Sequence, residues 1–275
     1  MKKTLTMILA AALVLSSMSA CSSKSRLDSI KEAGVIKMAT SPDFAPMEFE
    51  NIGADGSKEY VGSDIELGKY IAEKLGVELQ IEAMDFSAVQ AAVASGSVDM
   101  GISGFAWRED RAESMELSIG YNNTEDSEGQ GILILKEKAD ELNTAEAFAG
   151  LTVGAQNGSL QYSLVSEQLP SDVTIEKIGS LNDGILMLQT GKIDALAVSG
   201  ENGQLYAANY DEIVMSDFYF DYTSEGNVVA CKKGETELMG AINEIIKEVN
   251  EQGLYAQWSA EATELAKSLG ISVEG

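Results

Sequence analysis

Residues 86–102 read FSAVQAAVASGSVDMGI, and this stretch decides the fold. An apolar helical pattern leads into a short polar turn, and an apolar run of strand length follows it. The turn Ser95-Gly-Ser-Val-Asp99 returns as Thr190-Gly-Lys-Ile-Asp194, again between an apolar helical pattern and an apolar run. Residues 34–39 and 150–155 are a second similar pair in the same order. Chance similarity explains either pair alone, but the shared order favours two related lobes.

Short apolar runs alternate with helical patterns past residue 30, which predicts an α/β fold with largely parallel sheets. Residues 34–39, 77–83 and 98–102 are the expected strands of the first lobe. Ser63-Asp-Ile-Glu66 has the pattern of a capping box, in which the Ser63 side chain caps a helix that ends at Gly76. A stripe of apolar residues at helical spacing predicts another helix over 238–249.

Ligands of such α/β units bind beyond the carboxyl ends of the strands. Four segments follow expected strands, and we expect them to surround one cleft between the lobes. These segments are 40–49, 103–111, 156–160 and 199–201.

Composition excludes several kinds of function. The chain has 275 residues, enough for one large or two medium domains, and a formal net charge of -25. A nucleic-acid partner needs a basic face, so this charge argues against one. The absence of histidine excludes His-based catalytic triads and His-ligated zinc. Two cysteines are too few for a disulfide framework or a Cys-rich metal site, and we expect no metal and no cofactor.

The first twenty residues have the pattern of a signal peptide. Two lysines precede the apolar stretch LTMILAAALVL at 5–15, which is too short to span a membrane well. Small residues then lead to Cys21, in the order of a bacterial lipobox, so we expect lipidation of Cys21; an ordinary secretory signal is the alternative. Residues 21–29 are expected to be a tether.

Cleavage of the signal peptide removes two lysines and no acid, which lowers the net charge to -27. Cys231, within an apolar run, is expected to be a buried strand cysteine.

Seven stretches together carry a resemblance to a known family. They are SPDFAPMEF at 41–49, YVGSDIEL at 60–67, MDFS at 84–87, GSVD at 96–99, EDR at 109–111 leading to LS at 117–118, GLTVGAQNG at 150–158 and NEQGLY at 250–255. In this order, and with the lipobox, they resemble the extracellular amino-acid-binding proteins of ABC importers. The resemblance covers nearly the whole mature chain and implies the two-lobed type II periplasmic-binding-protein fold.

The resemblance implies a clamp that opens and closes around a small solute and delivers it to a membrane permease. The first lobe would hold residues 30–125 and 222–275, and the second residues 126–221, with two crossing segments. The protein would be extracytoplasmic, anchored to the cell membrane through Cys21, and a monomer. Its partners would be an amino acid or related carboxylate and an ABC permease.

Arg111 matches the family arginine that grips the α-carboxylate of the ligand, a role that suits a planar guanidinium. Backbone N–H groups of Gly104 and Ala106 would complete the cradle for this carboxylate. Phe44 and Phe86 match the aromatics that enclose the ligand side chain, although each alone is compatible with ordinary core packing. Ser103, Ser159, Ser199 and Glu201 complete the expected ligand-binding set.

Several positions depart from the family pattern, and they leave the ligand's identity open. The usual ammonium-binding aspartate is Ser199, and Glu201 lies two residues further along. The acidic residue three positions before the first aromatic is Ser41, and the hydroxyl expected after Gly-Ser is Leu160. The family hydroxyl three residues before the arginine is Arg108. An α-amino acid is the leading ligand class. The alternatives are a ligand with a second carboxylate, a modified amino acid and a short peptide-like solute.

We expect a binding protein and not an enzyme, but two other classes share this fold. A cyclohexadienyl dehydratase would use a carboxylate in the cleft, Glu48 or Glu201, as general acid or base. A receptor module would use the same clamp for signalling and is usually followed by a transmembrane span. The sequence pairs no nucleophile with a base and an orienting group, which argues against the enzyme, and the chain stops at Gly275 after a polar helix, which argues against the receptor module.

Overall fold

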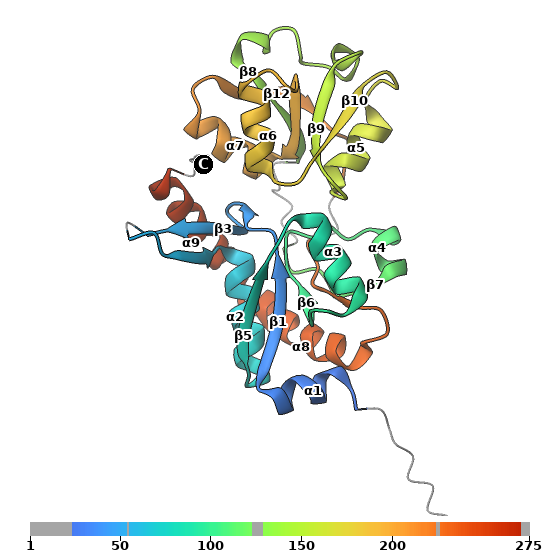
Figure 1. The fold of residues 1–275 in the computed structure, drawn as a ribbon, viewed down its shortest axis with the longest axis vertical. Helices are drawn as coiled ribbons and strands as arrows, with labels where there is room; N and C mark the ends of the chain where they lie inside the picture. Colours follow the sequence, from blue (N-terminus) through green and yellow to red (C-terminus); the bar gives the residue numbers. More distant parts are fainter. Residues whose placement is uncertain (1–23, 54, 123–128, 224–225, 271–275) are drawn as a thin grey trace, which may run out of the picture.

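The computed structural model describes residues 24–53, 55–122, 129–223 and 226–270, and these form two lobes stacked along the long axis (Figure 1). Each lobe is built on a five-stranded sheet. The expected signal peptide and Cys21 lie outside the described residues. The α/β class that the sequence predicts is confirmed.

The first lobe contains elements from both ends of the chain. They are α1 (Arg26–Ala33), β1 (Val35–Thr40), β2 (Asp43–Phe44), β3 (Glu48–Ile52), β4 (Lys58–Val61), α2 (Ser63–Leu75), β5 (Glu78–Ala83), α3 (Phe86–Ser95), β6 (Met100–Gly101), α4 (Glu109–Ser114), β7 (Met115–Leu117), β13 (Ala230–Lys232), α8 (Thr236–Gln252) and α9 (Leu254–Leu269). Its sheet has the order β5-β1-β6-β13-β7, and β2, β3 and β4 form a separate antiparallel sheet.

The second lobe comes from the middle of the chain. Its elements are β8 (Gln130–Leu135), two 3₁₀ turns (Lys136–Lys138 and Ala145–Phe148), β9 (Thr152–Gln156), α5 (Leu160–Gln168), β10 (Thr174–Ile178), α6 (Leu181–Gln189), β11 (Ala195–Ser199), α7 (Gly200–Asn209) and β12 (Ile213–Tyr219). The strand order is β10-β9-β11-β8-β12, with β8 antiparallel to both of its neighbours. The expected boundary at 221/222 falls between β12 and β13, whereas the one at 125/126 lies outside the described residues.

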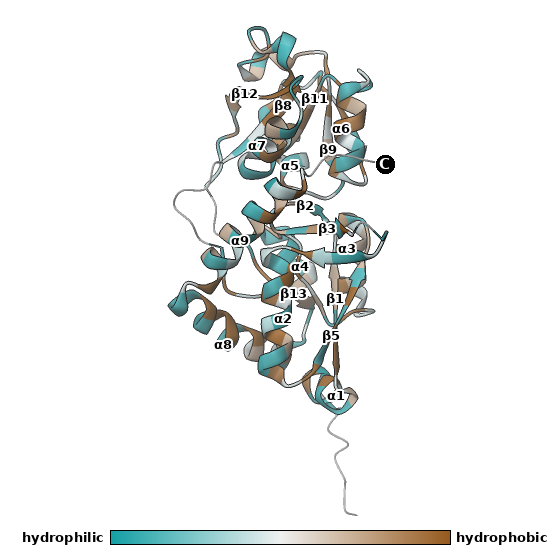
Figure 2. Ribbon diagram, turned by 90° about the vertical axis from the view of Figure 1, so that its left-hand side faces the viewer, coloured by the Kyte–Doolittle hydropathy of each residue, from teal (hydrophilic) through white to brown (hydrophobic). Residues whose placement is uncertain are grey.

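Helices cover both faces of each sheet, so alternate strand residues enter different cores. In the first lobe, Met38 packs with α2 and α8, whereas Ala39 packs with α3. In the second, Ile132 packs with α5 and Leu133 with α6. The strands of the second sheet are accordingly hydrophobic along most of their length, while the outer faces of the helices are hydrophilic (Figure 2). The buried face of α8 confirms the apolar stripe predicted over 238–249.

The internal repeat has a structural counterpart. Asp99 accepts a hydrogen bond from the backbone N–H of Lys37 on β1 at 2.7 Å, and its own N–H donates to the Lys37 carbonyl. Asp194 makes the same pair of contacts with Thr152 on β9, both at 2.8 Å. In each lobe, therefore, an aspartate before one strand fastens it to the strand that opens the unit. Cys231 is buried on β13, as expected, and burial raises the pKa of its thiol.

The capping box predicted at the start of α2 is wrong. The helix is capped by Gly62 without a side-chain hydrogen bond, and the Ser63 hydroxyl donates instead to the Tyr255 hydroxyl on α9 at 3.0 Å. The helix ends at Gly76 in a left-handed conformation, as expected. Ser63 is fully buried, so a distant tertiary contact outcompetes the local cap.

The tether expected at 21–29 is also wrong in its second half. Ser25 caps α1 by accepting from the N–H of Asp28, and the helix begins at Arg26. Ile30 is 3% exposed within the first core, and the Arg26 side chain forms an ion pair with Asp99. The stretch that forms α1 has too few apolar residues to predict a helix from sequence, because this helix is stabilised by its packing against the rest of the lobe.

Gly62 should be intolerant of any side chain. Its φ is +125°, and a Cβ there would lie 2.2 Å from the carbonyl oxygen of Met47. We expect Gly62→Ala to lower the free energy of unfolding by about 3 kcal/mol or more, because it combines backbone strain with a backbone clash. Gly240→Ala on the exposed side of α8, where no atom lies within 4 Å, should instead raise stability by about 0.5–1 kcal/mol. Urea unfolding of both variants tests the contrast, and equal effects would contradict it.

Candidate ligand-binding site

A cavity of about 570 Å³ lies between the two lobes. All nine residues expected to bind ligand line it: Phe44, Phe86, Ser103, Gly104, Ala106, Arg111, Ser159, Ser199 and Glu201. The first six come from the first lobe, and the last three from the second. Their direct contact with a ligand stays a prediction.

Arg111 lies in the last turn of α4 and is 3% exposed. Its Nη1 donates to the carbonyl of Ala106 at 2.7 Å, and its Nη2 donates to the carbonyl of Gly158, in the other lobe, at 3.0 Å. The guanidinium carbon lies 5.5 Å from the ring centre of Phe86 and 5.4 Å from that of Phe105. Its buried Nε has no hydrogen-bond partner among the described residues.

Arg111 forms no ion pair with a carboxylate among the described residues, although the charge of Asp110 acts on it from a greater distance. Within the described ranges, the arginine that forms an ion pair here is Arg108, which binds Asp110, and not Arg111. Burial and the charge of Arg108 lower the pKa of Arg111 to about 10, so it stays protonated at neutral pH. A buried cation held by two neutral carbonyls favours an anion beside it.

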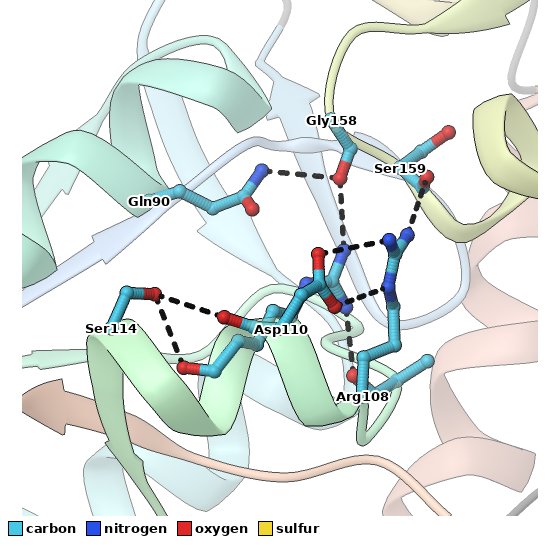
Figure 3. A network of polar contacts seen from close by, with 8 residues as sticks. Gln90, Arg108, Asp110, Ser114, Gly158 and Ser159 are labelled. Atoms are coloured by element: carbon cyan, nitrogen blue, oxygen red, sulfur yellow. Dashed lines mark hydrogen bonds and ion pairs between the residues drawn. The ribbon is translucent and has the colours of Figure 1, made fainter.

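Side chains of the first lobe reach across the cleft to the loop before α5. Figure 3 shows Gln90 directed at the carbonyl of Gly158, and Arg108 between Asp110 and the carbonyl of Ser159. The Arg108 contacts are 2.9 Å from Nε and Nη2 to the two carboxylate oxygens of Asp110 and 3.1 Å from Nη1 to the Ser159 carbonyl. The Ser159 hydroxyl caps α5 by accepting from the N–H of Tyr162.

The cradle expected at Gly104 requires a correction. The N–H of Gly104 donates to Oδ2 of the buried Asp64 at 2.8 Å, so it is not directed at a ligand carboxylate. Asp64 also accepts from the hydroxyls of Tyr121 at 3.0 Å and Tyr255 at 2.7 Å. Burial raises the pKa of Asp64, and these donors partly offset the rise. Asp64 therefore joins the cradle loop to α9.

The two aromatics differ in their surroundings. Phe86 is buried at the start of α3 and packs against Phe105, with ring centres 5.1 Å apart, beneath Arg111. Phe44 lies on β2 and packs against the core of the second lobe. Its ring also explains why residue 104 is glycine, because a Cβ there would lie 2.9 Å from it.

Acidic groups lie on the same cavity. Glu48 is 1% exposed, and its Oε1 accepts from the Ser103 hydroxyl at 2.8 Å. Burial and the neighbouring Asp64 raise the pKa of Glu48 well above its usual value. On the second lobe, Ser199 caps α7, and Glu201 lies in the first turn of that helix. Asp43, not anticipated as an individual site residue, also lines the cavity.

One flank of the cavity was missed altogether. Small and polar residues of α9 line it, namely Ala256, Ser259, Ala260, Thr263 and Glu264. The adjacent face of α9 places Ala262 and Ala266 in one cluster with Leu205 of α7, so the two lobes also touch here. Small residues recur along α9 at helical spacing, and this pattern could have indicated a closely packed helix face. It does not indicate which part of the protein that face contacts.

A search of the described residues finds no group of three or more potential metal ligands. Across the same ranges, no helix is long and apolar enough to cross a membrane.

Two α/β lobes that enclose a cavity lined by both apolar and polar residues, with a buried guanidinium at their junction, define a solute-binding protein of the two-lobed type. Comparison with known families agrees with this class. Residues 36–264 match the model of the bacterial extracellular solute-binding proteins, family 3, and the chain belongs to this family.

Individual relatives within and around this family are amino-acid-binding proteins. The arginine-binding extracellular protein ArtP of Bacillus subtilis is 27% identical over 259 residues, which cover 92% of this chain and 94% of ArtP. A probable histidine-binding protein of Campylobacter jejuni is 27% identical, with 93% and 96% covered. The amino acid ABC transporter substrate-binding protein AbpA of Streptococcus pneumoniae, solved with L-arginine bound, has a TM-score of 0.80 at 29% identity and covers 87% and 98%. The fold is therefore the type II periplasmic-binding-protein fold, and the relatives are amino-acid-binding proteins.

Asp64 should matter more to stability than any one of its donors. Asp64→Ala leaves the Gly104 N–H and two tyrosine hydroxyls without their acceptor, so we expect a loss of about 3 kcal/mol or more. Tyr121→Phe removes one donor to Asp64 and should cost only about 1 kcal/mol. Urea unfolding measures both losses. A tyrosine variant as unstable as the alanine variant would show that Asp64 does not join these elements.

Proposed function

We propose that the protein captures an α-amino acid outside the cell and delivers it to the permease of an ABC importer. The observation that carries this proposal is Arg111, a buried and protonated guanidinium that lines the cavity without a carboxylate partner among the described residues. A ligand α-carboxylate would supply the missing anion and accept charge-assisted hydrogen bonds.

The rest of the cavity suits the remainder of an amino acid. Ser103 and the carboxyl groups of Glu48 and Glu201 offer acceptors for an ammonium group, while Phe44 and Phe86 offer apolar contact. A volume of about 570 Å³ is that of an ordinary small-molecule site. Two of the relatives above are named for arginine and histidine, so basic amino acids are the first ligands to test.

The second candidate function is that of a dehydratase, and the burial of Glu48 at the cavity favours it. This buried acid lines the cavity, and burial and the neighbouring Asp64 raise its pKa well above the usual value, which favours the protonated form that a general acid needs. Turnover of prephenate or arogenate by the purified protein would place this function first.

The binding proposal predicts a strong effect at Arg111. We expect at least one of the common α-amino acids to raise the melting temperature, and Arg111→Ala to weaken its binding by about 100-fold or more, because two charge-assisted bonds are lost. Thermal shift followed by calorimetric titration measures both effects, with dipeptides and dicarboxylates in the same screen.

Lys69→Ala is the matched control, because this exposed lysine pairs with Glu66 away from the cavity. Its affinity should equal that of the wild type. Binding by Arg111→Ala at wild-type strength would refute the site, and a screen in which no α-carboxylate compound binds would refute the ligand class.

We also propose that the mature protein is anchored through a lipid on Cys21. In cells, the wild type should incorporate labelled palmitate and sediment with membranes, whereas Cys21→Ser should do neither. Equal labelling and sedimentation of the two proteins would contradict the anchor and favour an ordinary secretory signal.

A further inference from the structure

The segment 43–45 of the first lobe inserts into the second lobe. Phe44 packs against the core formed by α6, α7 and the second sheet. The Ala45 carbonyl accepts from Nδ2 of Asn202 on α7 at 3.0 Å, and the Asp43 carbonyl accepts from the Tyr206 hydroxyl at 3.4 Å. These contacts join the lobes at a place distinct from Arg111 and Gly158.

The Asp43 side chain makes the shortest of these contacts. Its Oδ2 accepts from the backbone N–H of Leu181 at 2.6 Å and from Nε2 of Gln156 at 3.1 Å, both in the second lobe. Its Oδ1 accepts from the Ser41 hydroxyl at 2.8 Å. Leu181 is the first residue of α6, where the N–H groups have no partner within the helix and the helix dipole is positive.

We propose that Asp43, Gln156 and the N–H of Leu181 form an inter-lobe latch, in which protonation of the Asp43 carboxyl stabilises the closed cleft and raises ligand affinity. Asp43 is thereby a positioning residue for binding. Opening the cleft would separate Asp43 from both of its partners in the second lobe and expose it to water. The affinity part of this inference rests on the proposed function.

The direction of the pH effect follows from burial. Asp43 is 8% exposed in this closed arrangement, and desolvation raises its pKa to about 6 from the ordinary 3.8. A group whose pKa rises on closure takes up a proton, so its stabilisation is complete below about pH 3.8 and is lost as the pH rises through about 6. A proton on Oδ1 leaves the two contacts that Oδ2 accepts from Leu181 and Gln156 in place, whereas the Ser41 hydroxyl, which donates to Oδ1 here, would have to turn and accept instead.

The ionisable groups around Asp43 supply no cation that would reverse this effect. Glu48 on β3 and Tyr206 on α7 each have a pKa raised in part by the charge of Asp43. Asp183 lies in the first turn of α6, and Asp85, before α3, faces Gly179. None of these four groups is a cation, so none of them stabilises an ionised Asp43 through an ion pair.

The test compares ligand affinity at pH 7 and pH 5 by calorimetry. L-Arginine is the probe, since it does not titrate in this range, and the amino acid with the largest thermal shift replaces it if it does not bind. Wild-type affinity should rise about ten-fold from pH 7 to pH 5, provided that the open form predominates without ligand. Ligand-free closure is followed by fluorescence transfer between dyes on Glu73→Cys and Lys192→Cys, which lie on different lobes and are exposed.

Two isosteric variants separate the latch from a merely structural role. Asp43→Asn keeps the acceptor but mimics the protonated state, so it should bind at least ten-fold tighter than wild type at pH 7 and lose the pH dependence. Gln156→Glu places a second carboxylate beside Asp43, so its affinity should fall at pH 7 and recover toward pH 5. Lys69→Ala is again the control and should keep the wild-type pH profile.

Other outcomes overturn the latch. Equal affinities and pH profiles for wild type and Asp43→Asn would show that Asp43 does not govern closure. Weaker binding by Asp43→Asn at both pH values would make Asp43 a direct ligand contact instead. If the wild type binds no amino acid, the proposed function fails, and the dye measurement decides the latch separately: equal closed fractions in wild type and Asp43→Asn overturn it.

Discussion

A buried positive charge is the constraint on which the cleft depends. Transfer of an unpaired ion from water into a protein costs several kcal/mol, and Arg111 recovers part of this through two carbonyls and two aromatic rings. One carbonyl, that of Gly158, belongs to the other lobe. The guanidinium is therefore better satisfied when the lobes are together, and an anion between them completes its coordination. Under the proposed function, ligand binding and closure would share one electrostatic cause.

The acidity of the chain makes this arrangement harder to achieve. With a net charge of -25, the surface as a whole repels an anion. Burial and the neighbouring Asp64 raise the pKa of Glu48 well above its usual value, which favours the neutral form of this carboxyl in the cavity. Asp64 is held by three donors and directed into the first lobe.

The sequence predicted those features of the fold that depend on interactions between residues close together in the chain. The strands, the helix stops at glycine and the two turns ending at Asp99 and Asp194 all follow from periodicity and turn chemistry. The cleft-lining segments followed from the rule that parallel strands present their carboxyl ends together. Ser63 was misassigned because its partner, Tyr255, lies 192 residues away, and no local pattern encodes that contact. The flank formed by α9 was missed for the same reason: spacing shows that a helix has two faces, not what each face meets.

The contacts across the cleft share a further property. Gly158, Ser159 and Ala45 each accept through a backbone carbonyl, and Leu181 donates through its backbone N–H. A backbone group is present whatever side chain the residue carries, so these closure contacts do not constrain the choice of side chain directly. Ligand specificity can then reside in the side chains that line the cavity, such as those at 41, 160 and 199, where this chain departs from its family. Arg111, Asp43 and Gln156 both join the lobes and line the cavity, so closure and ligand binding share these side chains. The resemblance predicts the clamp, whereas the departures at 41, 160 and 199 leave the identity of its ligand open.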